Sequence, residues 1–181
     1  MMCYMVRHGQ DDETVRGGWC DAELCPEGVE QVRELASQIR KHSVGGIYSS
    51  DLVRTRQTAE ILNEALKLEI HYLPQFREVN NGKLAGMKND AALVNYPGLF
   101  WSTLGWEEAY PEGESPKDFY ERIANAWKLF KDEVRNLPYD VILVTHGGVL
   151  NVIQCIEAGI AYTNKKNPFP VGYAQMIAIE I

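Results

Sequence analysis

The sequence predicts an α/β fold, a three-layer α/β/α sandwich in which helices cover both faces of a mostly parallel central sheet. Short apolar runs alternate along the 181 residues with longer runs whose apolar residues recur at helical spacing. The short runs are continuously apolar, which is typical of strands buried on both faces. A chain of this length fits one domain, so we expect residues 1–181 to form a single unit.

The first part of the chain contains three candidate strands and two candidate helices. The strands are expected at Cys3–Val6, Gly45–Ser50 and Leu68–Leu73, each a short apolar run between polar residues. One helix is expected at Pro26–Lys41, because proline suits a first helical turn. The other is expected at Thr55–Leu66, where alanine and leucine mark one face. This alternation is the pattern that builds a parallel sheet.

The second part interrupts the alternation and then resumes it. Residues 80–115 are punctuated by glycine and proline and contain many aromatic residues. We expect a lid-like excursion with partial helix there, since long irregular segments in compact domains usually serve a function. Its aromatic residues are more typical of core than of a ligand platform. The remaining elements are expected at Pro116–Arg135 (helix), Val141–Thr145 (strand), His146–Ala158 (helix) and Ala174–Ile181 (strand).

Charge and composition exclude several classes of partner. The formal net charge of -7 argues against nucleic acid or an anionic membrane surface. No apolar run approaches the ~20 residues of a membrane-spanning helix. The apolar run at residues 1–6 is too short for a signal peptide, so we expect a cytoplasmic protein. Four scattered cysteines without a C-x-x-C pair predict reduced thiols, with neither a disulfide framework nor a zinc site.

Two of the predicted strands end in a similar and unusual way. The strand expected at Cys3–Val6 is followed by Arg7, His8 and a glycine. The strand expected at Val141–Thr145 is followed by His146 and a glycine pair. Ligands of open α/β sheets bind beyond the carboxyl ends of the strands, so we expect both histidines at one rim. An arginine at a buried strand end needs an anionic partner. A second source of positive charge is the pair Arg54 and Arg56, which on its own is more typical of a solvated helix face.

This set of side chains has the chemistry of phosphoryl transfer. A phosphate needs several donors for its oxygens, open access for a nucleophile and a proton for the leaving alkoxide. Arg7 and Arg54 can offer forked donors. One neutral imidazole can attack phosphorus while a second, protonated one stabilises negative charge, since histidine titrates near pH ~6.5. A carboxylic acid must deliver the proton, and we expect no metal and no cofactor.

The chain resembles the histidine phosphatase superfamily, which has the phosphoglycerate mutase-like fold. The resemblance covers most of the chain and follows the family's order through six segments: VRHG, GGWCDAELCPEGVEQ, IYSSDLVRTRQTAEIL, REVNNGKLAGM, PEGESPKDFYERI and VTHGG. Each segment is weak alone, and the ordered set is highly specific.

The resemblance implies a role for each site residue. His8 would be the nucleophile and become a transient phosphohistidine. Glu78 would protonate the leaving group and later activate water, whereas its spacing alone favours a surface carboxylate. The phosphate would be bound by Arg7, Arg54, His146 and Gly147.

The chain departs from the family pattern directly after VRHG. The family often has Glu-Thr and then Trp-Asn, where this chain has Gln10, Asp11, Asp12, Glu13 and Thr14. Thr14 falls where the asparagine often touches phosphate, and its hydroxyl is a candidate donor. The three acids are unfavourable beside a phosphate pocket unless they point to solvent.

These features predict a phosphomonoesterase whose partner is a small phosphorylated metabolite. A mutase needs extra cations in the lid, and residues 80–115 contain Lys83 and Lys88 but no arginine. Phosphoglycerate mutase-type isomerisation is the alternative, and a catalytically weak phospho-ligand-binding protein is a third hypothesis. The substrate stays open, with α-ribazole phosphate, used by one family member, as one candidate. Composition does not decide the oligomeric state. One option is a homodimer in which the C-terminal strand, as a sheet edge, pairs with a second copy of the chain.

Overall fold

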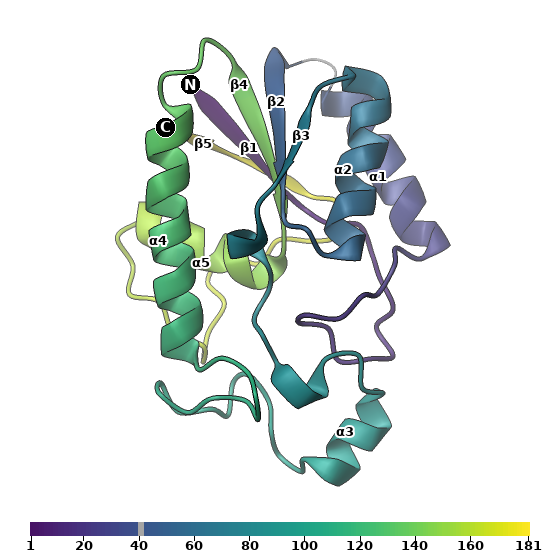
Figure 1. Ribbon diagram of the computed structural model, residues 1–181, viewed down its shortest axis with the longest axis vertical. Coiled ribbons are helices and arrows are strands. Elements are labelled where there is room, and N and C mark those ends of the chain that lie inside the picture. The colour runs from purple at the N-terminus through teal and green to yellow at the C-terminus, as the bar shows by residue number, and fades with distance from the viewer. Residues whose placement is uncertain (40–41) are drawn as a thin grey trace.

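The computed structural model describes residues 1–39 and 42–181 and has the predicted α/β/α layers (Figure 1). A single five-stranded sheet has the order β3-β2-β4-β1-β5. Four strands run parallel, and β5 pairs antiparallel with β1. The last residue pairs with the first, because the N–H of Ile181 donates to the carbonyl of Met1 at 2.9 Å. The strands are β1 (Met2–Arg7), β2 (Val44–Ser49), β3 (Ile70–Tyr72), β4 (Asp140–Thr145) and β5 (Met176–Glu180).

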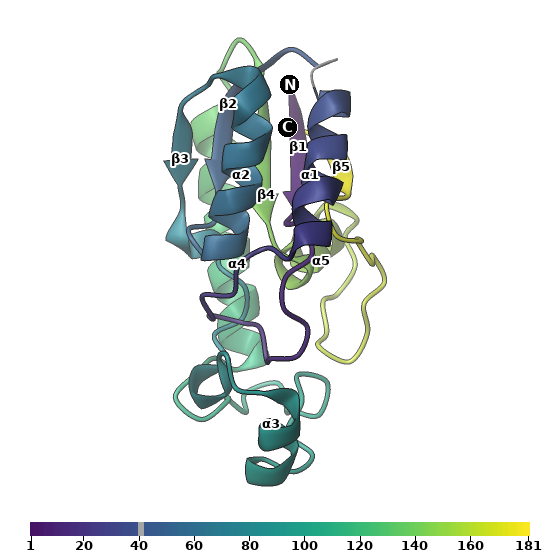
Figure 2. The same ribbon diagram turned by 90° about the vertical axis from the view of Figure 1, so that its right-hand side faces the viewer.

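Helices cover both faces of this sheet, α1 and α2 on one face and α4 and α5 on the other (Figures 1 and 2). Their bounds are α1 (Pro26–Ile39), α2 (Val53–Leu66), α3 (Asn89–Asn95), α4 (Pro116–Val134) and α5 (Gly147–Glu157). Two short 3-10 helices cover Pro74–Phe76 and Gly82–Leu84. Arg40 and Lys41, the predicted end of the first helix, lie outside the described residues. The other predicted elements are confirmed, with ends that differ by at most two residues. Among the helices described, none combines the length and the apolar character needed to cross a membrane.

Local sequence explains where α4 begins. Pro116 is its first residue, and a proline there loses no helical hydrogen bond. Ser115 and Asp118 form a capping box, in which each side chain accepts from the other's backbone N–H. The long excursion after β3 therefore ends at a defined residue, and the helix that follows packs on the sheet.

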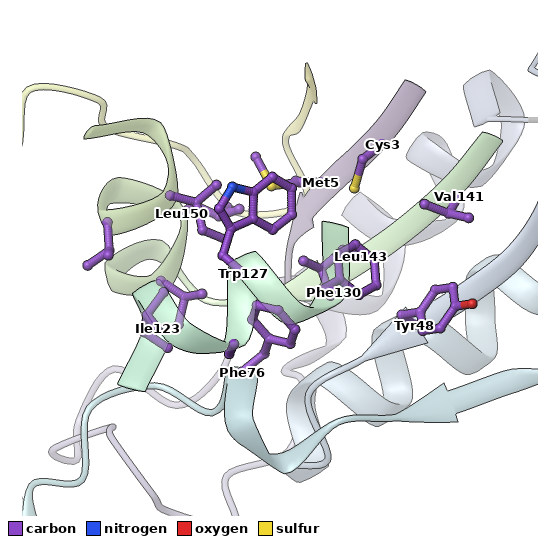
Figure 3. Close-up of a cluster of buried hydrophobic side chains, with 14 of the residues drawn as sticks. Cys3, Met5, Tyr48, Phe76, Ile123, Trp127, Phe130, Val141, Leu143 and Leu150 are labelled. Atoms are coloured by element: carbon purple, nitrogen blue, oxygen red, sulfur yellow. The ribbon is translucent and has the colours of Figure 1, made fainter. Parts of the chain in front are cut away.

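The larger core lies between the sheet and α4 and α5. Figure 3 shows Trp127 and Phe130 of α4 beside Met5 and Leu143 of the sheet, and all four are buried. The two α4 rings stack at 5.7 Å between centroids. Burying each large apolar side chain contributes roughly 1.5–3 kcal/mol, so this layer holds β1 and β4 firmly. Those two strands carry the predicted site at their ends.

The excursion has a small core of its own, formed by Leu84, Leu104 and Tyr110. Trp101 stacks on Tyr110 at 6.0 Å and meets Phe119 of α4 edge-on at 5.6 Å. The interpretation of the excursion's aromatic residues as core holds for Tyr110, which is buried, but not for Phe100 and Trp106, which are 37% and 42% exposed. In Figure 1 the excursion, with α3, extends away from the sheet at the bottom of the view.

Candidate active site

The strand ends bring the two predicted histidines together. β1 and β4 are parallel neighbours with Arg7 opposite Thr145, so His8 and His146 follow at the same rim. Their rings are 5.2 Å apart between centroids, at an interplanar angle of 60°. Both side chains are buried. The predicted shared rim is confirmed.

His8 directs a lone pair toward a buried arginine. Its Nδ1 lies 2.7 Å from the carbonyl oxygen of Gly9, and a carbonyl only accepts, so Nδ1 carries the proton. Nε2 accepts a hydrogen bond from Nε of Arg54 at 3.3 Å. Burial, followed by the charges of Arg54 and Arg7, lowers the pKa of His8 well below 6.5. The ring is therefore neutral at pH 7, in the tautomer that a nitrogen nucleophile requires.

His146 offers the second nitrogen of the pair. Its Nε2 lies 2.9 Å from Oγ of Ser50, which fixes the plane of the ring. Its Nδ1 is buried and has no hydrogen-bond partner among the described residues. Burial, then the charges of Arg54 and His8, lowers the pKa of His146 well below 6.5, so this ring is neutral in the free protein and not the protonated second imidazole expected from the sequence. A buried polar atom without a partner costs about 1–3 kcal/mol, which an anionic ligand would offset.

Arg54 is fixed in the site, while its neighbour Arg56 is not part of it. The Arg54 side chain is 2% exposed, and its two Nη atoms donate to the carbonyls of Cys20 at 3.1 Å and Gly18 at 2.8 Å. Arg56 is exposed and lies over the ring of Tyr72 at 4.5 Å. The solvated-face interpretation therefore holds for Arg56 alone.

Arg7 approaches the site from the end of β1. Its Nη1 donates to the carbonyl of Val171 at 2.7 Å, and its guanidinium lies 3.9 Å from the ring centre of Tyr173. Its buried Nε has no partner among the described residues. Gly147 begins α5 beside it, since a side-chain carbon there would lie 3.4 Å from that Nε. Arg7 and the N-terminus of α5 thus converge on the space beside His8.

Glu78 is held against the N-terminal turn of α5. Its Oε2 accepts from the N–H of Gly148 at 3.0 Å. A side-chain carbon at Gly148 would come within 2.3 Å of Oε1, so the carboxyl group could not keep this position beside a larger residue. The main-chain carbonyl of Glu78 accepts from Trp19 Nε1 at 2.6 Å and from Arg122 Nη2 at 3.1 Å. The carboxyl group has a defined position, unlike that of an ordinary surface glutamate.

A cavity of about 350 Å³ lies against part of this set, and the predicted residues His146 and Gly147 are not in its described wall. Its wall includes the predicted residues Arg7, His8, Arg54 and Glu78. The size suits a small-molecule ligand. The positive charge of the wall comes from arginine, and the rim carries the acids Asp11, Asp12 and Glu13.

Asp11 turns into the site instead of toward solvent. Its Oδ2 lies 3.4 Å from Nε of Arg54, and its side chain is 11% exposed. Burial raises the pKa of Asp11, and the charge of Arg54 opposes this shift. Asp12 and Glu13 are exposed, as expected for acids in this segment. Asp11 therefore lies where the resemblance would place a phosphate oxygen.

The structure does not bring Thr14 into the predicted site. Thr14 is exposed and is absent from the described cavity wall. Its hydroxyl and its N–H both donate to Oδ1 of Asp12, at 2.6 and 2.9 Å. Asp12 offers a local acceptor two residues away, a contact that competes with any longer reach into the cavity.

Three residues that the sequence analysis does not predict as site residues also contact or line the site. Ser50 follows the second strand directly, so its place in SSDLVRTR was a usable signal for the contact with His146. Tyr173 comes from the loop before β5, with its ring 5.7 Å from that of His8. Arg16 lines the cavity, and its buried Nε lacks a partner among the described residues. No sequence motif predicts a place in the site for Tyr173 or Arg16.

The described residues include no cluster of three or more His, Cys, Asp or Glu side chains able to hold a metal ion. All four cysteines are free. Cys20 is the one nearest the chemistry, because Arg54 Nη1 contacts its Sγ at 3.6 Å. The ionisable side chains in the cavity wall are those of histidine, arginine, aspartate, glutamate and Tyr173.

Four matches with known families and proteins are informative. A family model described as histidine phosphatase superfamily (branch 1) matches residues 3–181. Putative phosphoserine phosphatase 2 from Hydrogenobacter thermophilus is 30% identical over 170 residues, which cover 91% of this chain and 82% of that protein. Probable phosphoglycerate mutase GpmB from Escherichia coli O1:K1 / APEC is 30% identical over 169 residues, covering 88% and 76%. The crystal structure of the alpha-ribazole phosphatase from Shigella flexneri superposes with a TM-score of 0.87 and 22% identity, covering 100% of this chain and 91% of that one. This last match shows the fold.

Proposed function

The chain belongs to branch 1 of the histidine phosphatase superfamily, and from this premise we propose that it hydrolyses a small phosphate monoester through a phosphohistidine at His8. The named relatives include phosphatases and a mutase, which share phosphoryl transfer. The partner would be a small phosphorylated metabolite. The reaction would need no metal, because arginine and imidazole can carry the charge.

The contact between His8 Nε2 and Arg54 Nε carries the proposal. In the free protein the guanidinium N–H occupies the lone pair of the imidazole at 3.3 Å. An incoming phosphate offers that N–H a stronger acceptor, because an anionic oxygen binds guanidinium better than a neutral ring does. The lone pair is then released toward phosphorus. Binding of the phosphate and activation of the nucleophile are thereby one event.

The first step would form the N–P bond of His8 and break the P–O bond to the alcohol. Glu78 in its acid form would give its proton to the departing alkoxide. In the second step Glu78, now a carboxylate, would take a proton from water while the water oxygen attacks phosphorus. The N–P bond breaks, inorganic phosphate forms, and both residues return to their starting states.

Negative charge on the phosphoryl oxygens needs stabilisation in both steps. Arg7, Arg54 and His146 are the donors proposed for those oxygens. The buried Nδ1 of His146 and Nε of Arg7 have no partner among the described residues, which suits them to this role. Preorganised donors of this kind are typically the largest single contribution to such catalysis.

Hydrolysis has more support than mutase chemistry. A mutase must hold a substrate that carries a carboxylate and a phosphate and must keep water from the phosphohistidine. Lys83 of the excursion is paired with Glu112 at 2.8 Å, and the excursion contains no arginine. The acids Asp11, Asp12 and Glu13 at the cavity rim also repel a second anionic group.

The decisive experiment compares wild type with His8→Ala on p-nitrophenyl phosphate. We expect turnover in wild type that survives EDTA, and a loss of at least 10³-fold in His8→Ala. His71→Ala is the matched control, because His71 is exposed. An acid-labile phosphoenzyme should form in wild type and not in His8→Ala. Equal turnover in the two proteins would refute the mechanism, whereas phosphate binding without turnover would favour the phospho-ligand-binding hypothesis.

A further inference from the structure

A second cavity, of about 280 Å³, lies beyond the contact between Glu78 and Gly148. Glu78 lines the first cavity, and Gly148, to which its Oε2 is hydrogen-bonded, lines the second. The other walls come from Trp101 of the excursion, Asn151 of α5 and the loop that follows α5. The carboxyl group of Glu78 therefore lies where the two cavities approach each other.

The side-chain amide of Asn151 is a buried polar group at the wall of this cavity. Its side chain is only 5% exposed and contributes to the cavity wall. Within the described residues, its amide has one side-chain contact, from Cys155 Sγ to Oδ1 at 3.9 Å. A thiol is a weak donor, and buried amides normally satisfy their donors and acceptors. The amide of Asn151 is thus left with unused hydrogen-bonding capacity at the wall of a cavity.

Hydrogen bonds connect the segments that form the walls of this cavity. Nδ2 of Asn164 donates to the carbonyls of Trp101 at 2.6 Å and Leu104 at 3.0 Å. Nζ of Lys165 donates to the carbonyl of Ser102 at 2.8 Å and to that of Leu104. These bonds join the loop after α5 to the excursion. The cavity is therefore formed in the free protein, which reduces the cost of ordering a ligand.

The chemistry of the lining differs from that of the first cavity. The lining residues of the second cavity include the aromatic Trp101 and Tyr162, the amide-bearing Asn151 and Asn167, and the cationic Lys166. No carboxylate contributes to the described lining, whereas three acids stand at the rim of the first cavity. Aromatic faces accept the C–H surface of a ring, and amides can both donate to and accept from hydroxyl groups. Such a lining suits a polyhydroxylated group.

We propose that the second cavity binds the alcohol part of the substrate, and that this alcohol is a polyol of sugar size. The inference rests on the proposed function, because it takes the first cavity as the phosphate site and Glu78 as the proton donor. The ester oxygen must lie at the proton donor, with phosphorus on one side and the alcohol carbon on the other. A phosphate beside His8 then directs the alcohol past Glu78 toward Asn151.

The test compares kcat/KM for a panel of hexose and pentose phosphates with kcat/KM for phosphoserine and p-nitrophenyl phosphate. In wild type the best sugar phosphate should exceed both reference esters by at least about tenfold, as one or two lost hydrogen bonds would require. Asn151→Leu keeps the size of the side chain and removes its polar atoms. It should lower the ratio of sugar phosphate to p-nitrophenyl phosphate by about tenfold.

Because Asn151 is buried, Asn151→Leu could disturb folding, so a second variant tests the same cavity at an exposed position. Asn167 is exposed at the cavity, and Asn167→Trp should fill the cavity and lower the same ratio. Asn136→Leu and Asn136→Trp are the matched controls, since Asn136 is exposed in the turn between α4 and β4, and both should keep the wild-type ratio. Equal losses on all esters in both cavity variants would overturn the inference, as would a wild type that prefers the reference esters. Absence of turnover on every ester would instead refute the proposed function.

Discussion

The Oδ2 atom of Asp11 lies 3.4 Å from the Nε atom of Arg54, and the same Nε donates to Nε2 of His8 at 3.3 Å. One guanidinium N–H thus faces a carboxylate and an imidazole at once. An oxyanion that binds this N–H must displace both. In the free protein the proposed nucleophile, His8, and the proposed anion donor, Arg54, therefore block each other, and Asp11 is the charge that competes with an incoming anion.

Removing that charge should strengthen anion binding. For Asp11→Asn we expect the Kd of orthovanadate to fall about tenfold, because a like charge within a few ångströms costs an anion on the order of 1 kcal/mol or more. Burial raises the pKa of Asp11, so wild-type affinity should rise as pH falls and the carboxylate is neutralised. The variant should lose that part of the pH dependence. Asp132→Asn, at an exposed position on α4, is the control, and titration calorimetry measures both effects. Unchanged affinity in Asp11→Asn would show that Asp11 does not compete.

The two buried histidines should make the fold sensitive to acid. The pKa values of His8 and His146 are lowered in the folded protein, so below about pH 6.5 the unfolded chain binds more protons. The stability they contribute is complete above that pH and is lost as pH falls toward their folded pKa values. Each histidine should add about 1.4 kcal/mol per pH unit to the slope of unfolding free energy.

Urea unfolding between pH 7.5 and 5.5 measures this slope. His146→Gln should reduce this slope by the contribution of about one bound proton. His71→Gln, at an exposed position, should keep the wild-type slope. If His146→Gln retained the full slope, the buried ring would not be the neutral group described above.

Gly148→Ala should separate proton donation from phosphate binding. The added methyl group would meet Oε1 of Glu78 at 2.3 Å and push the carboxyl group aside. For alkyl phosphates, which need a protonated leaving group, we expect kcat to fall by roughly 10²-fold. p-Nitrophenyl phosphate, with a better leaving group, should lose much less.

The control for that substitution is Gly105→Ala. A methyl group at Gly105 makes only ordinary contacts, at 3.5 Å and beyond. Steady-state kinetics on both ester classes reads out the difference. A uniform loss on alkyl and aryl esters in Gly148→Ala would assign the effect to the phosphate site and not to Glu78.

Phe130 should be a major determinant of stability. It is 2% exposed and its ring packs against those of Tyr48, Phe76 and Trp127. Phe130→Ala should cost about 3–5 kcal/mol of unfolding free energy, measured by urea denaturation. Leu129→Ala, next along α4 but 58% exposed, should cost far less. Similar losses in the two variants would mean that the aromatic cluster is not the principal core.

The positions of the buried strands, and the edge of the sheet at which they end, could be predicted from the sequence. Continuously apolar strands could be located from periodicity, and parallel neighbours necessarily bring their carboxyl ends to one rim, so His8 and His146 were predictable as a pair. Arg54 and Arg56 could also be told apart in principle. Residues two apart on a helix point about 200° from each other, so only one of them can face the site.

The direction of short polar side chains was not predictable in the same way. Residues 11–14 offer several local acceptors, and the choice between them depends on tertiary contacts. Asp11 pairs with Arg54, which is 43 positions away, while Thr14 bonds to Asp12 instead of reaching the cavity. Tyr173 reaches Arg7 because β5 returns antiparallel to β1, a long-range pairing that leaves no local pattern.

The hydrogen bond between Ile181 and Met1 has a practical consequence for engineering this protein. Both ends of the chain emerge side by side at the edge of the molecule opposite the excursion (Figure 1). A reporter or an affinity tag fused at either end is therefore directed away from both cavities. A short linker between the two ends would allow the chain to be reopened elsewhere, as in a circular permutant, while the order of strands in the sheet is kept.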